Sequence, residues 1–300
     1  MKKEILVIGS SNTDMVIKTG MFPKPGETVV GGKFFMNPGG KGANQAVTAA
    51  RLGAKVTFIA KIGNDIFGKQ AVQGFINEGI DTQYILTDKS CPSGVALITV
   101  DEKGENSIVV APGANMELTP FDFSKANAAF EKAEVVLMQL ETPLDTVCFC
   151  AKLGNSSGKK VILNPAPATI LPEELYKELY AITPNETETE FLTGIKINDE
   201  ASVKSAAQWF KEKGVKNVVI TLGAKGVYLL NEKESMFVAA PVVIAMDTTA
   251  AGDVFNGALA TAISENIDWK KSLEFACKAA SISVTRMGAQ SSVPFRKEIN

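Results

Sequence analysis

Short runs of valine, isoleucine and leucine recur along this chain and alternate with stretches of helical spacing. This alternation restricts the fold more than any other feature. The runs are continuous, with few polar residues inside them, which is typical of strands covered on both faces. They lie at 4–10, 55–63, 133–141, 159–166 and 215–223. The sequence therefore predicts a three-layer αβα fold, with a mostly parallel central sheet between two layers of helices.

Two segments interrupt this alternation. Residues 14–38 are strand-like but punctuated by glycine and proline, and residues 93–112 have the pattern of a β-hairpin with its turn at 101–106. We expect them to pair into a small second sheet that forms a lid over the site; the alternative is that they only decorate the surface. Because the chain contains no repeat and no long linker, we expect a single domain over residues 1–300.

Composition excludes several classes of partner. With 45% hydrophobic and 21% charged residues and a net charge of −2, the chain has no long-range attraction for nucleic acid or anionic membranes. No apolar stretch approaches the roughly 20 residues that cross a bilayer. The run ILVI near the N-terminus is too short for a signal peptide and predicts a first strand instead. Four cysteines without C-x-x-C spacing favour a reducing, cytoplasmic compartment.

The chain contains no histidine. This absence rules out Ser-His-Asp triads, Cys-His dyads, histidine-ligated zinc and imidazole acid–base chemistry. Any proton transfer must therefore involve Asp, Glu, Lys or Tyr.

The segment DTTAAGD at 247–253 lies where a strand gives way to a helix. Small residues at 250–252 leave backbone N–H groups uncovered at the helix start, where they and the helix dipole stabilise negative charge. Asp253, in the first turn, is positioned to accept a proton from an attacking hydroxyl, as a general base does in phosphoryl transfer. A helix cap is the plainer explanation of Asp253, but it does not account for the small residues beside it.

Two further motifs carry groups suited to a polyhydroxylated ligand. Residues 36–54 form a glycine-rich turn followed by an alanine-rich helix, on which Lys41 and Asn44 share one face. The first strand ends with Asn12 and Asp14, and ligands gather at the carboxyl ends of parallel strands. Taken separately, each motif is equally compatible with an ordinary turn or helix start. No G-x-G-x-x-G is present, so a dinucleotide site is not indicated.

Two segments are candidates for a nucleotide site. Asn185 and Glu188 lie three apart at a probable helix start, where they can cap the helix or help to hold Mg²⁺ near phosphates. Residues 218–230 have the pattern of two strands joined by a turn with Gly223 and Gly226, beside Thr221. This segment is an ordinary hairpin unless a nucleotide lies against it.

Together these motifs resemble the ribokinase-like family of carbohydrate kinases. The resemblance runs almost end to end, through GSSNTDM, NPGGKGANQAVTAARLG, TPNETE, DTTAAGDVFNGALA and VTRMGAQSSVP. Within the family, GGKGANQA with Asn12 and Asp14 is similar to members that phosphorylate ribose rather than fructose or adenosine. The resemblance implies transfer of a phosphoryl group from ATP, with Mg²⁺, to the 5-hydroxyl of D-ribose, the first step of ribose catabolism.

The resemblance also implies a role for each matching residue. The positions that would face the sugar are Asn12, Asp14, Gly40, Lys41, Asn44 and Glu141. Asp253 matches the catalytic base, and Ala250, Ala251 and Gly252 match the anion hole for the γ-phosphate. The positions that match nucleotide contacts are Asn185, Thr221, Gly223, Gly226, Gly252 and Cys277, with Glu188 as the acidic residue associated with Mg²⁺. Cys277 departs from the polar or imidazole side chain that relatives often place near the adenine.

The family is activated by a monovalent cation, usually K⁺, bound beside the anion hole. The matching positions are Asp247, Thr249, Ser283, Arg286, Gly288 and Ser292. The two inserted segments match the family's lid, which closes over the sugar and often pairs with the lid of a second subunit, so a homodimer is expected. The family's C-terminal helix is expected to be short here.

Three other functions are open at this level. The acceptor can be another small molecule, such as 2-deoxyribose, fructose or a nucleoside, although a nucleoside pocket would need apolar groups around the base. A sugar sensor without activity is possible on the same fold, but binding alone needs no base such as Asp253. A nicotinamide oxidoreductase is disfavoured because the dinucleotide motif is missing.

Overall fold

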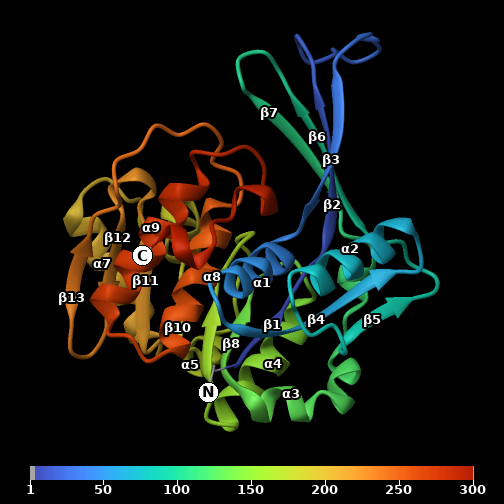
Figure 1. Ribbon diagram of the computed structural model, residues 1–300. Helices are drawn as coiled ribbons and strands as arrows, with labels where there is room; N and C mark the ends of the chain where they lie inside the picture. The colour runs from blue at the N-terminus through green and yellow to red at the C-terminus, as the bar shows by residue number, and fades with distance from the viewer. Residues whose placement is uncertain (1–3, 300) are drawn as a thin grey trace.

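The computed structural model describes residues 4–299. Its large sheet is built from the continuous apolar runs (Figure 1). All five residues of β1 (Glu4–Ile8) are buried. Ile5 and Val7 pack into the hydrophobic cluster on one face, whereas Leu6 and Ile8 pack into the cluster on the other. The sheet is therefore covered on both faces, and the predicted three-layer αβα architecture is confirmed.

The large sheet, in the described range, has nine strands in the order β13-β12-β11-β10-β9-β8-β1-β4-β5. From β11 to β5 all neighbouring pairs are parallel, and the two pairs at the other end, β11 with β12 and β12 with β13, are antiparallel. Besides β1, the strands are β4 (Lys55–Gly63), β5 (Ile85–Asp88), β8 (Ala133–Met138), β9 (Lys160–Leu163), β10 (Ala181–Ile182), β11 (Asn217–Thr221), β12 (Val227–Leu230) and β13 (Ser235–Val238).

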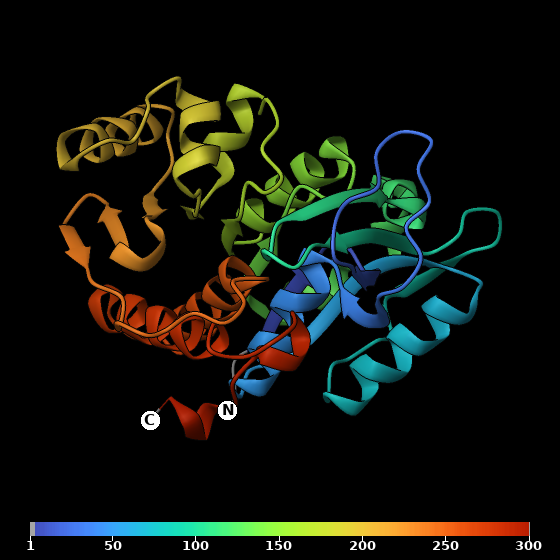
Figure 2. The same cartoon turned by 90° about the horizontal axis from the view of Figure 1, so that it is seen from above.

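Helices cover the two faces of this sheet in separate layers. Seen from above, the blue, cyan and red helices lie on one side of the sheet, and the green and yellow helices lie on the other (Figure 2). The first layer comprises α1 (Lys41–Arg51), α2 (Ile66–Asn77), α8 (Ala251–Ser264) and α9 (Trp269–Ser283). The second comprises α3 (Asn127–Lys132), α4 (Leu144–Ser156), α5 (Glu173–Glu178), α6 (Glu186–Thr193) and α7 (Glu200–Glu212).

Short 3₁₀ helices complete the chain. They are η1 (Gly113–Glu117), η2 (Pro120–Lys125), η3 (Gly223–Lys225), η4 (Gln290–Ser292) and η5 (Arg296–Glu298). After α9 the described chain therefore contains only single helical turns.

The two interrupting segments pair into a small sheet, as predicted. Its order is β3-β2-β6-β7, and it forms an arm that rises from the body of the molecule (Figure 1). The strands are β2 (Asn12–Lys18), β3 (Lys33–Gly39), β6 (Gly94–Val100) and β7 (Asn106–Ala111). Strands β6 and β7 are antiparallel, so the hairpin predicted at 93–112 is confirmed.

The parallel strands place their carboxyl ends along one edge of the large sheet, and polar residues follow several of them. Ser10 follows β1, Gln139 follows β8, Asn164 follows β9 and Thr183 follows β10. Helices α1 and α8 pack against each other and bring their N-terminal turns to the same edge. This edge therefore gathers most of the side chains singled out in the sequence.

Candidate functional site

Asp253 lies in the first turn of α8 and is buried. Its Oδ2 accepts a hydrogen bond from the side-chain amide of Asn44 at 2.9 Å, and its Oδ1 accepts one from Gln45 at 3.0 Å. Burial raises the pKa of Asp253 above its ordinary value, while the positive charge of Lys41 and the two amide donors oppose that rise. The site therefore contains a buried carboxylate held by neutral donors, with a cation nearby.

The backbone at the start of α8 is shaped to present N–H groups. Ala250, the N-cap, has φ 59°, in the left-handed region, and no side chain caps this helix. The N–H of Ala251 donates to the carbonyl of Thr248 at 3.2 Å. The N–H groups of Gly252 and Asp253 have no acceptor within the helix, since the first turn leaves such groups unpaired. A Cβ at Gly252 would meet nothing within 4 Å, so this end of the helix is open.

Lys41 and Glu141 come together where α1 begins. The backbone N–H of Lys41 donates to Oε2 of Glu141 at 2.9 Å, and the hydroxyl of Ser10 donates to the same oxygen at 2.5 Å. Burial lowers the pKa of the Lys41 ammonium, but the charges of Asp253, Glu141 and Glu188 outweigh it, so the pKa lies above its ordinary value. Lys41 therefore stays charged amid three carboxylates that lie on separate elements.

Asp14, on β2, completes this group of acidic residues. Burial, with the charges of Glu141 and Asp253, raises the pKa of Asp14 to about 6. Its carboxylate occupies space beside Gly39, where a Cβ would come within 2.3 Å of Oδ1. Any larger residue at position 39 would therefore displace the Asp14 carboxylate.

Gly40 and Asn12 lie in close contact next to Lys41. Gly40 has φ +88°, and a Cβ there would lie 2.7 Å from the backbone N of Asn12. Oδ1 of Asn12 accepts a hydrogen bond from Asn115 at 2.8 Å. The six residues expected to face a sugar thus lie together around Asp253; we call Asn12, Asp14, Gly40, Lys41, Asn44, Glu141 and Asp253 the polar cluster.

The residues expected at a nucleotide lie on neighbouring segments. Asn185 caps α6 and forms a reciprocal capping box with Glu188, in which Asn185 N–H donates to Glu188 Oε2 at 2.9 Å. Asn185 also bridges to Thr221, so the ends of β10 and β11 meet here. Burial raises the pKa of Glu188, opposed by this hydrogen bond and by Lys41. Capping therefore engages one carboxylate oxygen of Glu188, and the side chain remains close enough to Lys41 and Asp253 to interact with their charges.

The segment after Thr221 is a tight connection between antiparallel strands. Gly223 (φ +55°) opens η3, and Gly226 (φ +102°) closes it. The hairpin predicted at 218–230 is confirmed. Gly223 is exposed, which leaves its backbone open to a ligand.

Cys277 lies on α9 and is only 4% exposed, within the hydrophobic core between helices and sheet. Burial raises the pKa of its thiol to about 12. The thiol is therefore neutral and mostly covered by apolar neighbours, so it offers a ligand little hydrogen bonding.

The positions expected at a monovalent cation belong to two segments joined by Asp247. Its Oδ1 accepts from the N–H of Thr249 at 2.9 Å, and its Oδ2 accepts from the N–H of Gly288 at 2.8 Å. Burial would raise the pKa of Asp247, but these hydrogen bonds and the charge of Lys18 hold it below its ordinary value. Asp247 therefore carries a charge where the two segments meet, six residues before Asp253.

The other three positions of this set are engaged locally. The hydroxyls of Ser283 and Ser292 donate to the carbonyls of Ala280 and Ala289 at 2.8 and 2.7 Å. Arg286 is paired with Glu298 at 2.5 Å. In the described part of the chain, no three His, Cys, Asp or Glu side chains gather as a metal site. Such a group would consist of side chains only, whereas K⁺ in proteins is commonly bound by backbone carbonyl oxygens.

Three side chains behind Asp253 were missed by sequence reasoning. Gln45, Gln139 and Asn164 are buried and hydrogen-bonded to one another in series. A signal was available, because Gln139 and Asn164 each follow an apolar strand, as Asn12 and Asp14 do. Gln45 gave no such signal, since it looks like any polar residue on a helix.

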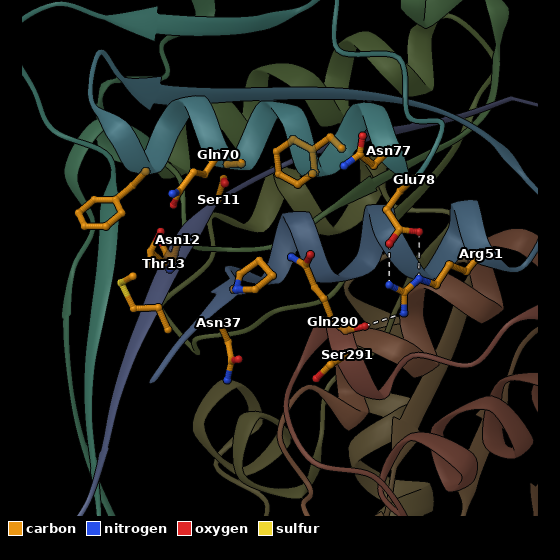
Figure 3. Close-up of a pocket in the computed structure, with 17 residues that line it drawn as sticks. Ser11, Asn12, Thr13, Asn37, Arg51, Gln70, Asn77, Glu78, Gln290 and Ser291 are labelled. Atoms are coloured by element: carbon orange, nitrogen blue, oxygen red, sulfur yellow. Dashed lines mark hydrogen bonds and ion pairs between the residues drawn. The ribbon is translucent and has the colours of Figure 1, made fainter. Parts of the chain in front are cut away.

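A cavity of about 500 Å³ lies between α1, α2, β3 and η4 (Figure 3). It shares Asn12 with the polar cluster, but Asp14, Lys41, Glu141 and Asp253 do not line it. Its charged residues, Arg51 and Glu78, satisfy each other in an ion pair of 2.6 Å. The chemistry is therefore better placed at the polar cluster than in this cavity.

Comparisons with known proteins show the family of this chain. The family model described as "pfkB family carbohydrate kinase" matches residues 2–296. Ribokinase of Haemophilus influenzae is 49% identical over 99% of this chain and 97% of its own, and deoxyribokinase of Salmonella typhi is 37% identical over the same shares. The structure of Arabidopsis thaliana ribokinase complexed with ribose and ATP matches with a TM-score of 0.95 and 32% identity, covering 100% of this chain and 98% of that one. The chain therefore belongs to the pfkB family of carbohydrate kinases.

Proposed function

We propose that this protein is an ATP-dependent kinase that phosphorylates the 5-hydroxyl of D-ribose, yielding D-ribose 5-phosphate and ADP. The observation that carries the proposal is the polar cluster, in which a buried carboxylate lies beside an open helix N-terminus and a charged lysine. Its relatives support both substrates, since one was solved with ribose and ATP. The reaction would be the first step of ribose catabolism.

The chemical step follows from the positions of Asp253 and of the N–H groups at the start of α8. The sugar's 5-oxygen attacks the γ-phosphorus, so that a new O–P bond forms while the bond to the bridging oxygen of ADP breaks. Asp253 takes the proton of the attacking hydroxyl. The N–H groups of Gly252 and Asp253, with the helix dipole, face the phosphoryl oxygens and stabilise their charge. Ala250 and Ala251 shape this anion hole through the left-handed turn.

The rest of the polar cluster would hold the sugar. Oδ1 of Asn44 is buried and has no hydrogen-bond partner among residues 4–299, so a sugar hydroxyl can supply one. Asp14 and Glu141 can accept further hydroxyl hydrogens, while Lys41 donates. A ring of hydroxyls thus satisfies groups that the protein leaves unpaired or crowded with like charge.

The nucleotide would lie across the segments of Asn185, Thr221 and Gly223, with its γ-phosphate at α8. Mg²⁺ commonly keeps several waters and few carboxylates, so Glu188, with one oxygen outside its capping box, fits a sparse site. When bound, Mg²⁺ would neutralise phosphate charge. Asn185 and Glu188 would orient the phosphates toward Asp253.

A monovalent cation such as K⁺ would bind beside the anion hole. The segments of Asp247 and Gly288 are joined by hydrogen bonds, and their backbone carbonyls and one carboxylate are oxygen ligands of the kind that K⁺ takes. When bound, K⁺ would supply positive charge to the turn before α8. The residues themselves hold the turn in shape.

The small sheet would act as a lid and as a dimer interface. Closure over the sugar would exclude water, which competes as a phosphoryl acceptor. One face of the sheet carries Ile17, Phe34, Met36, Leu97 and Val109, all between 44% and 66% exposed. An exposed apolar face of this kind marks an interaction site, and a second copy's lid would cover it.

We also propose that the protein acts in the cytoplasm. Its four cysteines are free, which suits a reducing compartment. Within residues 4–299, no helix has the length and apolarity to cross a membrane.

A second candidate acceptor is 2-deoxyribose, because the relative from Salmonella typhi is a deoxyribokinase. A panel of acceptors with ATP and Mg²⁺, followed by ADP release, separates the candidates. We expect the highest kcat/KM with D-ribose, lower values with 2-deoxyribose and fructose, and the lowest with adenosine. A higher kcat/KM with any other acceptor would replace ribose in the proposal, and no turnover with any sugar would favour a sensor.

A further inference from the structure

A row of buried side-chain amides is joined by hydrogen bonds to Asp253. Gln45 donates from Nε2 both to Oδ1 of Asp253 at 3.0 Å and to Oδ1 of Asn164 at 3.1 Å. Its Oε1 accepts from Nε2 of Gln139 at 2.6 Å. We propose that Gln45 is a positioning residue for the reaction: held by Gln139 and Asn164, it fixes the Asp253 carboxylate in the orientation and the ionised form that proton transfer needs.

The row has a single direction. If the Gln45 amide were reversed, its oxygen would face the acceptor oxygens of Asp253 and Asn164, neither of which can donate a hydrogen. Asn164 is fixed in turn, because its Nδ2 donates to the carbonyl of Thr183 at 3.3 Å. Gln45 therefore cannot rotate to another partner without breaking its neighbours' bonds, and the carboxylate always meets a donor.

Gln45 acts through Asp253 rather than on a substrate. Its exposed fraction and that of Gln139 are both 0%. Gln139 fits only because position 9 is glycine, where a Cβ would lie 2.1 Å from its Oε1. Asn44, by contrast, bonds the other oxygen of Asp253 and keeps its own Oδ1 unpaired. The two donors thus have different roles: Asn44 has an oxygen left for the sugar, whereas Gln45 contacts only the base and its buried neighbours.

Charged groups also surround Asp253. They are Lys41 on α1, Glu141 after β8, Asp14 on β2 and Glu188 on α6. Three of these four are acidic and disfavour a further negative charge, as burial does. A neutral donor such as Gln45 stabilises the ionised carboxylate without adding a charge that would compete for the phosphate. Loss of that donor should make Asp253 harder to ionise.

The test replaces Gln45 by methionine, which has similar length and no hydrogen-bonding amide. It rests on the proposed function, so the wild-type chain is assayed first with ribose and ATP, and activity there is a separate result. We expect the ratio of wild-type to Gln45→Met kcat/KM to grow as the pH falls from 8 to 6. The fall in kcat/KM at low pH that reports the ionisation of Asp253 should move up by about one to two pH units, the effect of one hydrogen bond to a charged group. A KM for ATP close to wild type is expected.

Gln139→Met provides a second route if Gln45→Met does not fold. It removes only the bond that holds Gln45, so the same shift is expected at smaller size. In the double variant, Gln139→Met should add almost nothing, because it acts through Gln45. If Gln139→Met lowers kcat/KM equally in the wild type and in Gln45→Met, the two residues act separately. That result would contradict the proposal that Gln139 acts through Gln45.

Gln208→Met is a matched control. Gln208 also donates to a carboxylate, Glu212, at 3.0 Å, but on the surface of α7. Its pH profile should equal that of the wild type. A loss of activity in Gln45→Met that is the same at every pH would reduce Gln45 to a packing role and overturn the proposal, even if ribose kinase activity stands.

Discussion

The side-chain amide of Asn44, on α1, donates to Oδ2 of Asp253, on α8, across 2.9 Å, although 209 residues separate them. This bond joins the glycine-rich segment to the helix whose N-terminus is open. The groups suited to a sugar, on α1, therefore lie next to the groups suited to a phosphate, at the start of α8. An attacking hydroxyl that reaches Asp253 is therefore next to the N–H groups that would receive the phosphoryl charge.

Asp253→Asn should abolish most of the turnover while leaving the fold intact. Asparagine keeps the shape but cannot accept the proton, so kcat should fall by at least about 10²–10⁴, the contribution typical of a general base. A coupled ADP-release assay measures this, and calorimetric binding of ATP should stay close to wild type. Asp145→Asn, at an exposed position on α4, is the control. Near-wild-type turnover in Asp253→Asn would remove Asp253 as the base.

Local patterns predicted much of this structure. Continuous apolar runs gave the buried parallel strands, because a strand covered on both faces has no polar face to show. The helix start at Asn185 and the hairpin around Gly223 were visible because each depends on residues a few positions apart. The polar cluster followed in part from the rule that ligands gather at strand ends.

Side chains joined over long distances in the chain were not predictable. Gln45 bonds residues 94, 119 and 208 positions away, so no window of sequence contains the pattern. The same holds for Asp247, whose contact with Gly288 spans 41 residues. The capping role of Glu188 was predicted as an alternative and is present in the structure. The sequence does not show that this cap already engages one of the two carboxylate oxygens.

Sugar affinity should depend on the protonation of Asp14. The pKa of this carboxyl is about 6, and under the proposed function the ionised form would accept hydrogen bonds from sugar hydroxyls at both of its oxygens. The kcat/KM for ribose should therefore fall as the pH drops through 6. In Asp14→Asn the contribution of Asp14 to this fall should be lost, so that only the ionisation of Asp253 remains in the pH profile, while KM for ribose rises. A pH profile unchanged in this variant would mean that Asp14 contributes nothing to the fall and that Asp253 alone sets it.

The same substitution should stabilise the protein without ligand. The pKa of Asp14 in the folded state, about 6, lies above its ordinary 3.8, so the folded chain holds this proton more tightly than the unfolded chain does. Ionised Asp14 thus lowers the free energy of unfolding above pH 6, and this cost vanishes as the pH falls toward 4. Asp14→Asn should gain on the order of 1 kcal/mol at pH 7.5 and almost nothing at pH 4. Denaturant unfolding at both values checks this; an equal gain at both would indicate packing instead.

A monovalent cation should raise the rate, and Asp247 should set how much is needed. Replacing K⁺ by tetramethylammonium at constant ionic strength should slow the wild type. Asp247→Asn removes one unit charge beside the proposed site, which at about 4 Å is worth roughly 1 kcal/mol or more. The K⁺ concentration for half-activation should therefore rise on the order of tenfold. An identical wild-type rate in both cations would take K⁺ out of the proposal.

The apolar face of the small sheet should hold two copies together. Leu97, 54% exposed, pairs across the sheet with Met15 and Val109, so these side chains share that face. Wild-type protein should sediment at twice its 31.9 kDa, and Leu97→Asp should sediment as a monomer because a charge would be buried in the contact. Ile108, similarly exposed at 52%, belongs to the opposite face, so Ile108→Asp should remain dimeric. A monomeric wild type would contradict the proposed dimer. Dimers in both variants would mean that the two copies meet at another surface, since only the face that carries Leu97 is expected to contact a second lid.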